Sequence, residues 1–96
     1  MKKSKYSIVR TQLAGVFMGI IKSRKGSEVV VTDARRLWYW SGASTLSQLS
    51  QEGVKRPDQC KFPVAVPEIT VLNVIEILPC TAVAEASVKG VKVWAQ

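Results

Sequence analysis

The stretch 15–32, GVFMGIIKSRKGSEVVVT, decides the fold that this chain predicts. Residues 16–21 carry no polar side chain, residues 22–27 are polar apart from Gly26, and a β-branched run follows Glu28. Two strand-like runs joined by a short, glycine-bearing connection are typical of a β-hairpin. Because glycine inside a strand pattern marks a bend or a close backbone approach, Gly15 and Gly19 predict a sharply curved first strand.

Further strands are predicted on both sides of this hairpin. Residues 8–12 alternate between the two faces of a half-buried strand. Residues 33–34 predict a turn and residues 35–40 a third strand. The prolines of segment 62–67 predict that it lies at a sheet edge or crosses over, since proline cannot donate to a ladder. Residues 68–79 predict the longest strand region, apolar on both faces.

Two short helices are predicted. Thr45 and Gln48 have the spacing of a capping box, and Gly53 is a natural stop. Thr81 caps a second brief helix that ends near Gly90. Residues 55–61 between the helices form a polar loop. After the second helix, the tail over 91–94 alternates apolar and polar residues, as a strand does.

These elements predict a mainly β (α+β) fold. Either a small antiparallel barrel of the SH3-like or Sm-like kind or a curved sheet fits, with one or two short helices. The length of 96 residues allows a single domain, which we place at 8–96. Residues 1–7 are expected to form a flexible basic leader. At this size a single core is marginal, so a homo-oligomer is expected.

The net charge of +7 is unevenly distributed along the chain. Up to Lys61 there are twelve basic and four acidic residues, which gives +8, whereas the rest of the chain carries −1. Such asymmetry points to a partner with phosphates or other anions, either a small ligand or a nucleic acid. The alternative is a charge that serves only solubility.

The residue types argue against the common catalytic chemistries. The chain has no histidine, its carboxylates are scattered, and it contains no phosphate-loop or hydrolase motif. Cys60 and Cys80 lack CxxC spacing and are expected to be reduced thiols. We therefore expect no enzyme, with no catalytic residues, no metal and no cofactor.

The N-terminal region imitates a signal peptide without fitting one. Arg10 and Gln12 interrupt the approach to the apolar run, and Lys22 begins a polar segment where a cleavage site would lie. No apolar run reaches the roughly 18 residues that a membrane span needs. The sequence thus predicts a soluble, cytoplasmic protein with no membrane partner.

The stretch 35–42, RRLWYWSG, concentrates charge and aromatic surface. In a strand, alternate residues face opposite sides, so Arg36, Trp38 and Trp40 share one face, opposite Arg35, Leu37 and Tyr39. Guanidinium and indole groups together suit phosphates and stacked bases. The alternative is that the aromatic side chains lie in the core or in an interface.

The segment after these aromatics contains further candidate residues for binding an anion. Backbone N–H groups at a helix start, together with the hydroxyls of Ser41, Ser44 and Thr45, form an anion pocket in this interpretation. Gln48 completes the set of candidate ligand-binding residues. The alternative is ordinary helix capping, which uses one of these hydroxyls.

Five segments of the chain resemble an uncharacterised family of small phage-encoded proteins. They are residues 35–43 (RRLWYWSGA), 46–49 (LSQL), 52–54 (EGV), 67–69 (PEI) and 74–77 (VIEI). The resemblance runs from about Val9 to Trp94. It implies a phage origin and carries over no catalytic residues.

A phage origin implies, by analogy, an anti-defence role. One class of small phage proteins sequesters nucleotide immune signals as oligomeric sponges without cleaving them. By this analogy the ligand is a small anion, such as a cyclic nucleotide or an ADP-ribose derivative. Two alternatives remain: a small barrel that binds nucleic acid, and a structural or protein-inhibiting module that uses the Trp face and residues 69–77 as interfaces.

Overall fold

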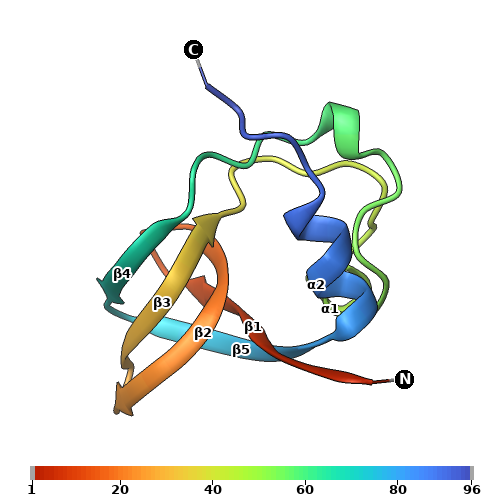
Figure 1. Cartoon of the computed structure of the whole chain (residues 1–96). Coiled ribbons are helices and arrows are strands. Elements are labelled where there is room, and N and C mark those ends of the chain that lie inside the picture. The colour runs from red at the N-terminus through yellow and green to blue at the C-terminus, as the bar shows by residue number, and fades with distance from the viewer. Residues whose placement is uncertain (1, 96) are drawn as a thin grey trace.

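The computed structural model describes residues 2–95 and consists of one sheet and two α-helices (Figure 1). The elements in chain order are β1 (Lys3–Thr11), β2 (Val16–Lys25), β3 (Glu28–Arg36), α1 (Leu46–Glu52), the 3-10 helix η1 (Pro57–Gln59), β4 (Val66–Val71), β5 (Val74–Thr81) and α2 (Ala82–Lys89). The predicted mainly β class with two short helices is confirmed.

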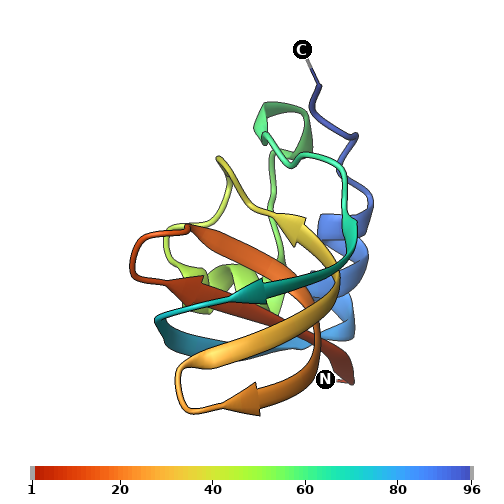
Figure 2. The same cartoon turned by 90° about the vertical axis from the view of Figure 1, so that its left-hand side faces the viewer.

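The five strands form a single antiparallel sheet in the order β4-β3-β2-β1-β5. Of the two architectures that the sequence left open, the structure is a curved sheet and not a closed barrel. The two edge strands, β4 and β5, are nevertheless consecutive in the chain, separated only by Leu72 and Asn73. The sheet therefore curls until its opposite edges meet at this short link, as Figure 2 shows.

The prediction of one long strand over 68–79 is wrong. The backbone of Asn73 has a φ of 56°, in the left-handed region, and this breaks the segment into β4 and β5. Asparagine tolerates that conformation better than other non-glycine residues, which explains its position at the link. The proline-bearing segment before it does lead into an edge strand, as predicted.

The predicted flexible leader is also wrong for the residues that the structure describes. Strand β1 begins at Lys3, not at Ile8, and Lys3 pairs with Thr81 of β5. The alternation of exposed Lys5 with buried Tyr6 explains why a basic segment forms a strand here. Met1 lies outside the described residues.

The β2–β3 hairpin turns at Gly26 and Ser27, and its register shifts between Met18 and Ile20. Opposite this shift, β3 continues to Arg36, so the predicted turn at 33–34 is wrong. Asp33 instead adopts a φ of 48° within the strand, which is the geometry of a β-bulge. The bend predicted at Gly19 coincides with this irregularity.

We expect the substitution Gly19→Ala to lower the free energy of unfolding by about 2–3 kcal/mol, at the upper end for overpacking. A Cβ atom at residue 19 would lie 2.4 Å from Cγ1 of Val31 and 2.8 Å from the carbonyl oxygen of Thr32. Val31 is fully buried and has no room to move. Urea unfolding of Gly26→Ala provides the control, because its Cβ meets no atom within 4 Å and only its positive φ costs about 1 kcal/mol. Equal losses in the two variants would contradict this packing argument.

The apolar residues form two clusters on opposite faces of the sheet. Neighbouring residues fall into different clusters, as strand alternation requires: Ile8 and Met18 in one, Val9 and Phe17 in the other. The cluster of Ile8 also contains residues from both helices, which cover this face. The helices lie against each other beside β1 and β5 (Figure 1).

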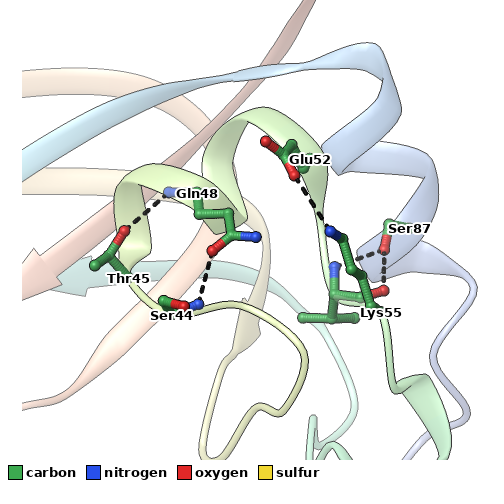
Figure 3. Close-up of polar contacts among 7 residues, drawn as sticks. Ser44, Thr45, Gln48, Glu52, Lys55 and Ser87 are labelled. Atoms are coloured by element: carbon green, nitrogen blue, oxygen red, sulfur yellow. Dashed lines mark hydrogen bonds and ion pairs between the residues drawn. The ribbon is translucent and has the colours of Figure 1, made fainter.

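Both predicted helix starts and stops are confirmed. The hydroxyl of Thr45 caps α1 and that of Thr81 caps α2, while Gly53 and Gly90 end them. Gly53 lies against Ser87 of α2, whose hydroxyl accepts a hydrogen bond from the backbone N–H of Val54 at 2.9 Å (Figure 3). The predicted tail strand is reduced to one bridge between Phe62 and Val93. Neither α-helix in the described chain has the length and apolar character needed to cross a membrane.

Candidate ligand-binding groove

The aromatic stretch leaves the sheet directly after β3. Arg36 is the last residue of β3, and the predicted strand over 35–40 is therefore wrong beyond that point. The backbone N–H of Leu37 still donates to the carbonyl of Val16 at 2.8 Å, and Tyr39 forms an isolated bridge with Lys61. The segment is thus held from two sides without joining a ladder.

The side chains of this segment divide between core and surface. Leu37 is buried, and Trp40 packs half-buried against the same cluster. Trp38 and Tyr39 are 64 % and 52 % exposed. Arg35, Leu37 and Tyr39 were predicted to share the opposite face of a strand, but Tyr39 lies at the surface while Leu37 is buried, because the strand ends before them.

Arg36, Trp38 and Trp40 nevertheless meet around one groove of about 550 Å³, which we call the Arg36 groove. Its other side is the β1–β2 turn. The lining residues are Leu13, Ala14, Gly15, Val16, Arg36, Leu37, Trp38 and Trp40. The structure therefore brings together the three candidate residues that the sequence placed on one face.

The guanidinium group of Arg36 is held at a fixed position in this groove. Its Nη1 donates to the carbonyl of Ala14 at 2.6 Å, and its Cζ lies 4.5 Å from the centroid of the Phe17 ring. Among residues 2–95, no carboxylate forms an ion pair with Arg36. A fixed cation without a protein counter-ion is suited to bind an anion.

The four other candidate residues do not line the groove and make other contacts; they are Ser41, Ser44, Thr45 and Gln48. Thr45 and Gln48 form a capping box, in which the N–H of Gln48 donates to Oγ1 of Thr45 at 3.1 Å and Oε1 of Gln48 accepts from the N–H of Ser44 at 2.9 Å (Figure 3). The hydroxyl of Ser41 faces Gln59. Ordinary capping, the alternative interpretation, accounts for the contacts of Ser44, Thr45 and Gln48, and an anion pocket formed by these residues with Ser41 stays a prediction.

Sequence reasoning missed the residues of the β1–β2 turn. Leu13 is 86 % exposed at the rim of the groove, although a large apolar side chain usually predicts burial. Gly15 has a φ of 96°, which favours glycine at this turn, and the turn lies beside the Arg36 side chain. In the sequence, a leucine near a glycine turn is only a weak indication of a binding site. The indication can be interpreted only in the structure, where the turn contacts Arg36.

The described residues offer little for metal or thiol chemistry. Across residues 2–95, no three of the cysteines and carboxylates gather at one point to hold a metal ion. Cys60 and Cys80 are free thiols, both buried. Burial raises the pKa of the Cys80 thiol to about 11, which keeps it protonated and unreactive at neutral pH.

Comparison with known proteins gives one match. A family model described as "Domain of unknown function (DUF6948)" matches residues 4–88. No curated protein and no solved structure matches the chain.

Proposed function

This chain belongs to the DUF6948 family, a domain of unknown function, and we propose that it is a non-enzymatic protein that binds a small anionic ligand carrying a flat ring. A nucleotide has this combination of groups. The observation that carries the proposal is the Arg36 groove, where a fixed guanidinium lies beside an exposed indole.

Each part of such a ligand has a partner in the groove. A phosphate would take charge-assisted hydrogen bonds from Arg36, whose position is set by Phe17 and Ala14 before the ligand arrives. A base would stack on Trp38, an interaction worth about 1–3 kcal/mol per base. The groove volume of about 550 Å³ lies within the 300–1,000 Å³ typical of small-molecule sites.

The finer proposal concerns biological role. We propose that this is a phage protein that sequesters a nucleotide immune signal, such as a cyclic nucleotide or an ADP-ribose derivative, as a homo-oligomer. Sequestration requires affinity and no bond-making chemistry, which agrees with a preformed groove that offers a cation and aromatic surface. The exposed Leu13 and Trp38 at the rim provide apolar surface that a ligand or a second copy would cover.

Thermal unfolding with a panel of cyclic dinucleotides, cyclic trinucleotides and ADP-ribose derivatives tests the proposal. A ligand present at 100 times its Kd contributes about 2.7 kcal/mol. For a domain of this size each kcal/mol raises Tm by about 4–8 °C, so we expect a rise of at least about 10 °C. In Trp38→Ala, the loss of about 1–3 kcal/mol of stacking weakens binding by roughly 5- to 150-fold, and Arg36→Met weakens it by at least about tenfold.

Tyr39→Ala is the matched control for Trp38→Ala. Tyr39 is a neighbouring aromatic of similar exposure that does not line the groove. The substitution Tyr39→Ala should therefore leave the ligand affinity unchanged. The absence of any shift across the panel, or an equal loss in Tyr39→Ala and Trp38→Ala, would refute the assignment of the groove.

A further inference from the structure

A second pocket, of about 300 Å³, lies between the end of α2 and the sheet. We call it the Tyr6 pocket. Its polar side chains are Tyr6 from β1, Asp33 and Arg35 from β3, and Lys89 from α2. Apolar side chains, among them Met18 and Val88, form the rest of its wall. It shares no lining residue with the Arg36 groove.

The polar groups of this pocket form a connected set. The hydroxyl of the buried Tyr6 donates to the carboxylate of Asp33. The Nζ of Lys89 lies 4.2 Å from the centroid of the Tyr6 ring and donates to Glu85 at 2.8 Å. An acceptor at the hydroxyl of Tyr6 and a donor near its ring are thus held by one phenol side chain.

The protonation states of Tyr6 and Lys89 are fixed near neutral pH. Burial, and then the hydrogen bond to Asp33, raise the pKa of Tyr6, so its hydroxyl keeps its proton. The hydrogen bond to Glu85, and then that to Tyr6, raise the pKa of Lys89, so its amine stays charged. The Tyr6 hydroxyl and the Lys89 ammonium group therefore both remain hydrogen-bond donors.

The charges around the pocket balance one another. The ammonium group of Lys89 forms an ion pair with Glu85, and the pocket lining contains both the carboxylate of Asp33 and the guanidinium of Arg35. Arg35 in turn directs its N–H groups at backbone carbonyls and away from a ligand. A ligand with a net charge of either sign would meet a like charge in the pocket, which favours an uncharged molecule.

The backbone conformation at Asp33 sets the direction of its side chain. Its φ of 48° lies in the bulge opposite Gly19, a conformation that costs free energy in a non-glycine residue. Bulges of this kind re-aim a side chain and are over-represented beside functional sites. Here the bulge turns the carboxylate toward Tyr6 at the pocket.

We propose that the Tyr6 pocket binds an uncharged cyclic amide, whose ring N–H donates to Asp33 and whose carbonyl accepts from Lys89. The ring lies against the apolar wall of Met18 and Val88. The lactam edges of several nucleobases present this same pair of groups. The proposal does not depend on the Arg36 groove, since the two sites share no residue.

Titration of the ¹⁵N-labelled protein with 2-pyridone, followed by NMR, tests this site. We expect amide shifts that saturate and that centre on Tyr6, Asp33, Val88 and Lys89. N-methyl-2-pyridone, which has the same ring without the N–H donor, should bind at least about tenfold more weakly, because it leaves the carboxylate of Asp33 unpaired. Benzoate and benzylammonium, two charged rings of similar size, should also bind more weakly.

Variants of the protein complete the test. Asp33→Asn keeps the shape of the side chain and tolerates a positive φ, so it should fold, and we expect about a tenfold loss of affinity for 2-pyridone. Lys89→Met should lose a similar factor. Arg36→Met and Trp38→Ala should leave 2-pyridone binding unchanged, which separates a failure here from a failure of the Arg36 groove. Equal binding of the N-methylated ring or of either charged ring, or no localised shift up to the solubility limit, would overturn the proposal.

Discussion

Replacing Arg35 by alanine is expected to lower the free energy of unfolding by about 3–5 kcal/mol. The guanidinium donates to four backbone carbonyls from two separate segments: Pro63 at 3.0 Å, Phe62 at 3.1 Å, Val88 at 2.8 Å and Val91 at 2.8 Å. Each hydrogen bond from a charged donor contributes about 1.5–3 kcal/mol, although neighbouring bonds are not additive. Its loss also removes the side-chain hydrogen bonds to the carbonyls of Pro63 and Val91, whereas those of Phe62 and Val88 keep a backbone N–H donor.

The physical reason is that one side chain ties the segment before β4 and the end of α2 to β3. Burial lowers the pKa of Arg35, but a guanidinium remains charged at any ordinary pH, so the tie is not broken by titration. Arg35→Lys should restore little of the lost stability, because a single ammonium group cannot reproduce the planar fork.

Urea unfolding of three variants checks this expectation. Arg24→Ala is the matched control, since its side chain is exposed and donates only to the nearby carbonyl of Gly26. We expect a loss within about 0.5 kcal/mol for Arg24→Ala, as for other surface substitutions. If Arg35→Ala were as stable as Arg24→Ala, or if Arg35→Lys were as stable as the unmodified protein, the four hydrogen bonds of Arg35 would not contribute the predicted stability.

Replacing Phe62 by alanine is expected to cost about 3–5 kcal/mol, the usual range for a fully buried phenylalanine. Phe62 is one of the two largest fully buried side chains, and it lies in the cluster under both helices. Its carbonyl accepts hydrogen bonds from Arg35 and from the backbone N–H of Trp94 at 3.0 Å. The cavity left by alanine would therefore loosen the point where three segments meet.

The control lies two residues away in the same extended segment. Val64 is 65 % exposed, so Val64→Ala should change the free energy of unfolding by about 0.5 kcal/mol or less. Phe62→Leu retains most of the apolar volume and should cost clearly less than Phe62→Ala. A loss below about 1 kcal/mol for Phe62→Ala in denaturant unfolding would contradict its assignment to the core.

The elements predicted correctly from the sequence are those with local signals. The β2–β3 hairpin is encoded by a polar, glycine-bearing turn between apolar runs, and both helices by a threonine cap and a glycine stop. The bulge at Asp33 and the break at Asn73 were missed because these irregularities depend on contacts made elsewhere in the sheet. Asn73 did carry a readable signal, since asparagine is enriched at positive φ.

The placement of the candidate site residues was predicted in part. Arg36, Trp38 and Trp40 converge as expected, although the strand assumed for them ends at Arg36. The polar residues around Ser44 belong to the helix cap, a local role that was already an alternative. The Tyr6 pocket was not foreseen, because Tyr6, Asp33 and Lys89 are distant in sequence and meet only when the sheet curls around α2.

The strand order also constrains how the chain is completed during synthesis. Strand β1 pairs with β5, so the first strand to leave the ribosome waits for one of the last before its outer edge is covered. Until then the nascent chain exposes an unpaired edge with apolar residues, which is a site for unwanted association. Pairing between such distant segments also slows folding. A chain that stops before Val74 would have no partner for that edge, and the whole sheet therefore depends on the last quarter of the molecule.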